Sequence, residues 1–192
     1  MIPDDIDDSA MIHLVKQHSK EEQIALKEKM MRYAIGKLKW PDKPIKGYED
    51  FKAYNTFFVK NMPAAFDVCA LCNALYFVYF YQLPINEQDE HSLKLLVKCV
   101  SQDDYIHRPY EMSPYYPNTT IIIYHLVRLM VDLQLKELQP YWEKLLSQIN
   151  QKLAITNLNE IERLLLTICL QKLSPQKIVI ETPSLREKTH FP

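Results

Sequence analysis

The sequence predicts an all-α protein, in which helical pairs form part of an α/α toroid or, alternatively, an irregular helical bundle. Two observations lead to this fold class. The 192 residues include only two glycines, Gly36 and Gly47, which argues against glycine-rich phosphate loops and hairpin-rich β folds. Apolar residues also recur at helical spacing, and a long apolar helix alternates with more amphipathic ones, as inner and outer helices of a solenoid do.

The N-terminal third predicts one long helix and one short helix. Apolar positions recur with charged residues between them over residues 9–37, which predicts the long helix. Pro41 and Pro44 then mark a loop. The short helix is predicted over residues 48–61, where aromatic side chains share one side at helical spacing: Phe51, Tyr54, Phe57 and Phe58.

Residues 64–83 are apolar on nearly every side, which predicts a central buried helix that ends before Pro84. Asp67 and Asn73 are polar positions within it. Because buried polar groups need hydrogen-bond partners, we expect each of them to be paired. The residues expected in the core of this helix are Phe66, Cys69, Leu71, Leu75 and Val78.

The remaining chain predicts further helices and an irregular tail. Asn118 or Thr119 is expected to cap one of these helices. The predicted helices span residues 87–101, 119–132, 136–153 and 159–173, with an irregular segment over 102–117. Residues 1–173 are therefore expected to form a single domain, which we interpret as a fragment of a toroid. Residues 174–192 form the tail, in which 177–182 can make one strand.

Charge and apolar runs exclude several classes of partner. Lys plus Arg total 23 and Asp plus Glu total 24, so no basic surface for nucleic acid or anionic membranes is expected. The N-terminus is acidic where a secretory signal is basic, and the apolar run of residues 68–81 is too short to cross a bilayer. A cytoplasmic protein without a transmembrane segment is the expectation.

Cys69 and Cys72 form a C-x-x-C pattern, which can indicate a metal or redox site. Inside a long apolar helix, with no second cysteine or histidine pair nearby, free cysteines packed as small hydrophobes are the favoured interpretation. No metal site is therefore predicted at this position.

Four carboxylates occupy five positions at the start of the first predicted helix: Asp4, Asp5, Asp7 and Asp8. One interpretation is a helix cap, in which Asp7, Asp8 or Ser9 accepts hydrogen bonds from first-turn N–H groups. Another is general acid catalysis, which requires a carboxylic acid that stays neutral at about pH 7 beside an apolar substrate. Asp7 would be this acid, and Asp5 and Asp8 would tune it.

The run Asp5-Ile6-Asp7-Asp8-Ser9-Ala10 resembles the Asp-x-Asp-Asp-Thr-Ala motif of class II terpene cyclases, whose middle aspartate protonates an isoprenoid alkene. Two further stretches are similar to bacterial members of the terpenoid cyclase and prenyltransferase toroid superfamily. They are Phe57-Phe58 followed by Asp67 and Asn73-Ala74-Leu75, and Ser113-Pro114-Tyr115-Tyr116-Pro117-Asn118 followed by Tyr124 and Arg128.

The resemblance implies site residues as well as a fold. Asp7, Asp5 and Asp8 would be catalytic, and the substrate-binding residues would be Asp67, Asn73, Tyr115 and Tyr116. The aromatic pair could shield a carbocation by cation–π attraction, or simply pack its loop across the helix ends. Asp67 and Asn73 could line a cavity or join two helices by hydrogen bonds.

The run Asp4-Asp5-x-x-Asp8 also matches the acidic motif by which prenyl-diphosphate enzymes hold Mg²⁺. That motif belongs in the middle of a helix, whereas Pro3 places this one at a helix start, and no second metal-binding motif is present. No cofactor is therefore predicted, although Mg²⁺ could accompany a diphosphate substrate.

Two functions follow as expectations. One is a class II terpene cyclase-like domain that cyclises an isoprenoid when it is part of a complete enzyme. The other is a non-catalytic helical module that binds a peptide, lipid or protein partner, or a second helical domain. Half a toroid cannot keep a carbocation away from water, which favours the module for this chain.

Overall fold

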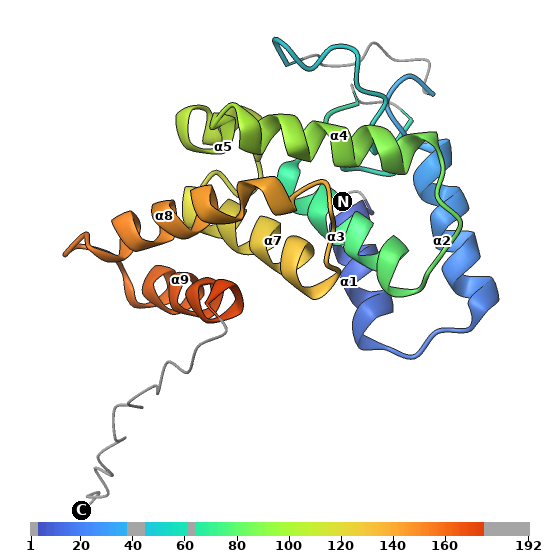
Figure 1. Ribbon diagram of the computed structural model, residues 1–192. Coiled ribbons are helices and arrows are strands. Elements are labelled where there is room, and N and C mark those ends of the chain that lie inside the picture. Colours follow the sequence, from blue (N-terminus) through green and yellow to red (C-terminus); the bar gives the residue numbers. More distant parts are fainter. Residues whose placement is uncertain (1–3, 38–44, 61–63, 175–192) are drawn as a thin grey trace, which may run out of the picture.

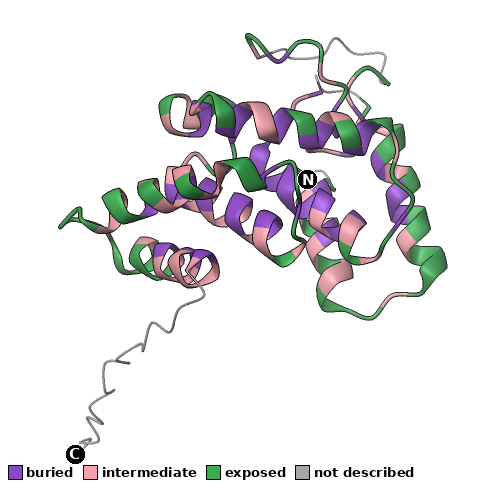
Figure 2. Cartoon of the chain, in the orientation of Figure 1, coloured by how far each residue is buried: buried purple, intermediate pink, exposed green. Residues whose placement is uncertain are grey.

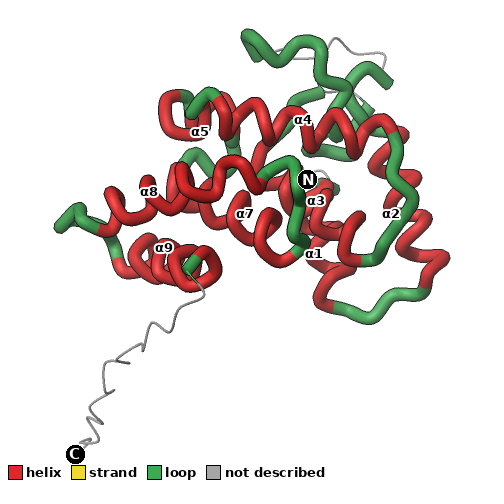
Figure 3. The backbone as a smooth tube through the Cα atoms, in the orientation of Figure 1, coloured by secondary structure: helices red, strands yellow, loops and turns green. Residues whose placement is uncertain are grey.

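Helices make up the regular structure of residues 4–37, 45–60 and 64–174, which are the residues that the computed structural model describes (Figures 1 and 3). No strand occurs among these residues, so the all-α prediction is confirmed. The α-helices are α1 (Ile6–Val15), α2 (Lys20–Arg32), α3 (Val68–Phe80), α4 (Glu87–Ser101), α5 (Asp104–His107), α6 (Pro109–Met112), α7 (Thr119–Asp132), α8 (Trp142–Leu153) and α9 (Glu160–Leu173), and a 3₁₀ turn, η1 (Gln139–Tyr141), precedes α8.

The helices form two sets. In the first, α1 packs against α3, α3 against α7, and α7 against α9. Helices α2, α4 and α8 pack on α1, α3 and α9 respectively. Figure 1 shows α1 and α2 at one end of the molecule, α8 and α9 at the other, and α3 and α7 between them. Helical pairs are therefore present, and their closure into a toroid remains a proposal.

Neighbouring helices of the first set, which consists of α1, α3, α7 and α9, run in the same direction. Asn73 in α3 donates to Asp7 early in α1, and Tyr81 at the end of α3 donates to the carbonyl of His13 late in α1. Because earlier residues pair with earlier ones and later with later ones, the two helices are parallel. Helix α7 follows the same rule relative to α3, and α9 relative to α7.

Helix α3 is the centre of the core. It begins at Val68, after the cap residue Asp67, so it is shorter than the predicted 64–83. Leu75 and its predicted companions Cys69, Leu71 and Val78 are buried within the helix, and Phe66 is buried just before it. Figure 2 shows buried residues gathered along α3 and on the neighbouring sides of α4 and α7.

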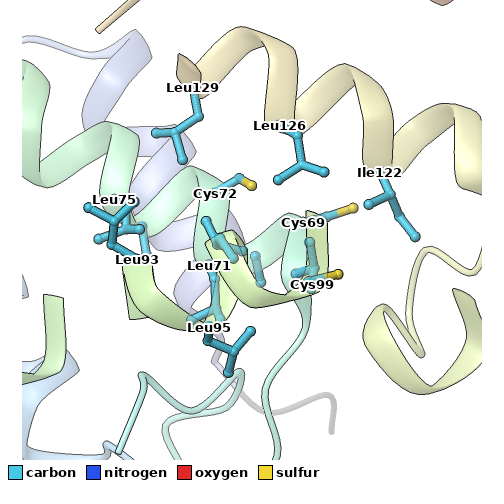
Figure 4. Packing of buried hydrophobic residues seen from close by; sticks show 14 of the residues in the cluster. Cys69, Leu71, Cys72, Leu75, Leu93, Leu95, Cys99, Ile122, Leu126 and Leu129 are labelled. Atoms are coloured by element: carbon cyan, nitrogen blue, oxygen red, sulfur yellow. The ribbon is translucent and has the colours of Figure 1, made fainter. Parts of the chain in front are cut away.

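The C-x-x-C pair belongs to this core. Cys69 and Cys72 lie with leucine and isoleucine side chains of α7 (Figure 4), and both are free and buried. Burial raises the pKa of both thiols well above the ordinary value. These thiols therefore pack as small hydrophobes, as the favoured interpretation of the pattern expected. Among the described residues, no group of three or more His, Cys, Asp or Glu side chains is arranged to hold a metal ion.

The single long helix predicted over residues 9–37 is wrong, because α1 and α2 are separate. Helix α1 ends at Val15, and Ser19 begins α2 with a capping box. The Ser19 hydroxyl accepts from the Glu22 N–H at 3.2 Å, and the Glu22 carboxylate accepts from the Ser19 N–H at 2.8 Å. This reciprocal pairing satisfies N–H groups that a helix start leaves free, and so stabilises a new start.

The short helix predicted over residues 48–61 is absent from its described part, residues 48–60. Its backbone instead bonds to segments distant in the sequence. The Ile6 N–H donates to the carbonyl of Thr56, and the Phe58 N–H donates to the carbonyl of Asp4, both at 2.9 Å. The aromatic residues at helical spacing pack into the core from this extended chain, since Tyr54 is fully buried.

The later predictions match closely. Helix α4 spans the predicted residues 87–101, and Asn118 caps α7 over the predicted 119–132. The segment 102–117, predicted as irregular, contains the short helices α5 and α6. The helix predicted over 136–153 begins only at Trp142, after η1, and the one predicted over 159–173 corresponds to α9. No helix of the described residues is long and apolar enough to cross a membrane. The strand expected at 177–182 lies outside the described residues.

Candidate functional site

Asp5 is the cap of α1. Its carboxylate accepts from the Asp8 N–H at 2.7 Å, so the cap predicted at Asp7, Asp8 or Ser9 is wrong by at least two positions. Burial raises the pKa of Asp5, and the bond from Asp8 opposes this rise. Asp4 forms an ion pair with Lys29 of α2. Two of the three acids in the predicted Asp-Asp-x-x-Asp pattern are therefore engaged within the chain.

Asp7, the second residue of α1, does not cap the helix and instead contacts α3 and the loop before α7. Its Oδ1 accepts a hydrogen bond from the side-chain amide of Asn73, and its Oδ2 accepts from the Tyr116 hydroxyl at 2.7 Å. Asn73 is buried, Asp7 is half-buried and the Tyr116 ring is 37% exposed. The structure thus brings together three residues that the sequence predicts for the site, from α1, from α3 and from the loop before α7.

Arg128 of α7 completes this arrangement. Its guanidinium donates to the Asn73 Oδ1. Because arginine can only donate, the oxygen of Asn73 must face Arg128 and its NH₂ must face Asp7. Asp7, Asn73, Tyr116 and Arg128 therefore form one chain of hydrogen bonds, called here the Asp7–Arg128 network. The sequence resemblance includes Arg128, but the predicted site residues do not.

The guanidinium of Arg128 has no direct counter-ion among the described residues. No carboxylate of theirs lies within 4.0 Å of it, and its buried Nε has no hydrogen-bond partner there. Its Cζ lies 4.7 Å from the centre of the Tyr76 ring, and its NH groups lie 4.0 Å from the Met11 sulfur. Its hydrogen-bonded link to Asp7 passes through Asn73.

His125 lies three residues before Arg128 on α7. Its Nδ1, like the Nε of Arg128, is buried and has no hydrogen-bond partner among the described residues. Burial, and after it the charge of Arg128, lower the pKa of this imidazole to about 4, against an opposing effect of Asp7. His125 is therefore neutral at pH 7. No sequence pattern pointed to His125, because it forms no metal-ligand spacing with other histidines.

A pH dependence of stability follows from His125. In the unfolded chain an ordinary histidine takes up a proton below about pH 6.5, whereas folded His125 stays neutral down to about pH 4. Since the unfolded state binds more protons in this window, stability should fall as pH decreases from about 6.5 to about 4. Urea unfolding at several pH values should show a smaller decrease for His125→Gln. Equal pH profiles for the variant and the wild type would contradict the prediction.

Asp67 and Tyr115 belong to a separate cluster. The Asp67 carboxylate caps α3 and accepts from the Ser113 hydroxyl at 2.8 Å and from the Tyr115 N–H at 3.1 Å. Asp67 is fully buried, and burial raises its pKa. The Tyr115 ring packs edge-on against Phe57 at 5.0 Å. These contacts join a helix start to a loop, so the substrate-binding role of Asp67 and Tyr115 remains a prediction.

The contacts of the Asp7–Arg128 network are the basis for interpreting this site. The chain has no match among protein-family models, among curated proteins or among solved structures.

Proposed function

We propose that this chain is a helical binding module that holds a lipid-like ligand on the face formed by α1, α3 and α7. The observation that carries the proposal is the Asp7–Arg128 network, a polar centre contributed by all three helices, beside exposed apolar side chains. Phe80 in α3 is 52% exposed and Val15 in α1 is 79% exposed. Polar groups that fix orientation beside apolar surface are typical of small-molecule sites.

Partly exposed and exposed apolar side chains continue from the network along two parallel helices. Asn73, Tyr76 and Phe80 share one side of α3 because of the helical period, and the rings of Tyr76 and Phe80 stack at 6.1 Å. On α1, Met11 and Val15 follow Asp7 at four-residue spacing, which also places them on one side of their helix. Since α1 and α3 run in the same direction, both strips extend the same way, and an apolar chain could lie along them.

The surroundings of Asp7 favour binding over protonation of an alkene. Its Oδ1 accepts an N–H bond from Asn73, and its Oδ2 faces the Tyr116 hydroxyl, which suits a carboxylate. The exposed ring of Tyr116 also leaves this side of the site open to water. A general acid for an alkene needs a retained proton and exclusion of water, and these contacts provide neither.

A class II cyclase reaction is the second candidate, and one observation favours it. Asp7, Asn73, Tyr116 and Arg128 all lie in stretches that resemble the cyclase superfamily, and they form one network. If a second helical domain covered the site and excluded water, Asp7 could act as the acid on an isoprenoid. Asp5, at the helix cap, and the exposed Asp8 would have indirect roles.

Asp7→Asn separates the two candidates. For the module, we expect wild type to bind farnesol in a fluorescence-displacement assay, and Asp7→Asn to bind it within about twofold, since asparagine keeps the size of the side chain. Mass spectrometry should find no cyclised product from squalene, farnesyl diphosphate or geranylgeranyl diphosphate.

A paired control locates the binding face. Phe80→Ser should weaken farnesol binding at least tenfold, whereas Ile155→Ser, an exposed position in the loop after α8, should not change it. Cyclised product from wild type that disappears in Asp7→Asn would replace the module with the cyclase. An absence of farnesol binding would contradict the module.

A further inference from the structure

We propose that Arg128 binds the anionic head group, a carboxylate or a phosphate, of the amphiphile that occupies this face. This inference rests on the proposed lipid-binding function and adds the charge of the ligand. Its basis is that the guanidinium has no direct counter-ion among the described residues. Arginine is suited to the role, because its planar set of N–H donors matches the oxygens of a carboxylate or phosphate.

The charge of Arg128 is incompletely compensated within the described residues. Its buried Nε lacks a hydrogen bond, and its link to Asp7 passes through Asn73. Lys172 of α9, by contrast, forms a direct ion pair with Asp132. Arg128 as a whole is only half-buried, so an anion could reach its N–H donors and supply the direct partner that the described residues lack.

The side chains around Arg128 fit an anionic head. The Tyr76 ring holds the guanidinium in place by a cation–π contact at 4.7 Å. His125 is neutral, and its unpartnered Nδ1 can carry an N–H that donates to an anion. Asp7, the acidic residue of the network, is separated from Arg128 by Asn73. The anionic head group would therefore contact the side of Arg128 that faces away from Asn73.

The direction of the apolar strip sets the pose of the ligand. Phe80 lies two helical turns beyond Asn73 in α3, and Arg128 pairs with Asn73 at the start of that strip. With its head at Arg128, an apolar chain would extend over Tyr76 towards Phe80 and away from Asp7. A single-chain amphiphile therefore fits better than a free anion, which would leave the apolar strip uncovered.

Chain-matched probes test this inference: farnesol, farnesoic acid and farnesyl phosphate, with inorganic phosphate and acetate as anions that lack a chain. Wild type should bind farnesoic acid or farnesyl phosphate at least tenfold more tightly than farnesol, and this preference should shrink at high salt. Binding of inorganic phosphate or acetate should be at least a hundredfold weaker.

Arg128→Gln should abolish the preference for the anionic probes over farnesol, measured as the ratio of their affinities within the variant. Arg128→Lys keeps the charge and should retain part of the preference. Arg163→Gln, an exposed arginine on α9, is the matched control and should behave as wild type. Circular dichroism of each variant checks the fold.

Three outcomes would overturn the inference. Equal affinity of wild type for farnesol and the anionic probes would remove the head-group role while leaving the proposed module intact. Binding of inorganic phosphate as tight as that of farnesyl phosphate would point to a free anion instead of an amphiphile. If no probe with a farnesyl chain binds, the module and the inference fail together.

Discussion

Replacing Asp89 with alanine is expected to lower the free energy of unfolding by about 3–5 kcal/mol, because it leaves a buried lysine without its partner. Asp89 at the start of α4 is fully buried and forms an ion pair with Lys27 of α2, which is also buried. Burial lowers the pKa of Lys27, and the hydrogen bond to Asp89 opposes this. Asp89 also accepts from the Tyr54 hydroxyl at 2.6 Å. Urea unfolding followed by circular dichroism would measure the loss.

Two controls separate the buried charge from general disturbance of α4. The exposed Lys94–Glu90 pair, at 3.4 Å on the same helix, should contribute little, so Glu90→Ala should cost under about 1 kcal/mol. The double change Lys27→Met with Asp89→Leu should cost less than Asp89→Ala, since no unpaired charge remains. A loss below about 1 kcal/mol for Asp89→Ala would show that the pair does not hold α2 against α4.

Leu75→Ala is expected to cost about 2–5 kcal/mol, because it opens a cavity in the central helix. Leu75 is fully buried in α3. It lies in the core near Leu71 of the same helix and Leu93 of α4 (Figure 4). Few of these neighbours can move into the space, since α3 is packed by α1, α4 and α7. Thermal and urea unfolding would both report the loss.

Leu164→Ala makes the same chemical change at an exposed site. Leu164 on α9 is 59% exposed, so its truncation should change the free energy of unfolding by under about 0.5 kcal/mol. Similar losses for the two variants would mean that α3 is not the centre of the core.

Local capping chemistry made part of the fold predictable from the sequence. Asn118 was predicted as a cap of α7, and its side chain accepts from first-turn N–H groups, as that of Asn86 does before α4. Such caps act within four residues, so sequence reading can locate them. The Ser19-x-x-Glu22 box is equally local, but the continuing apolar pattern concealed the break that it makes between α1 and α2.

Residues 48–60 were not predictable in this way. The aromatic spacing there matches a helix, but the backbone of Thr56 and Phe58 bonds to distant partners, Ile6 and Asp4. Tertiary pairing therefore overrides the local pattern. A single sequence gives no measure of contacts between segments far apart in the chain.

The candidate site also contains some residues that the sequence predicted and others that it did not. Asp7, Asn73 and Tyr116 were predicted through the family resemblance and lie together. Their partner Arg128 and the neutral His125 were not predicted as site residues. Their relevance depends on missing partners and burial, which only the packed structure shows.

The parallel packing of α1, α3, α7 and α9 has a consequence for folding kinetics. Parallel neighbours cannot be joined by a short turn, so each contact between them closes a long loop. Asp7 and Asn73 are 66 residues apart, Asn73 and Arg128 55, and Asp132 and Lys172 40. The chain must lose the entropy of closing these loops before their contacts form. It should therefore fold more slowly than a bundle of the same size whose successive helices pack antiparallel, although both are entirely helical.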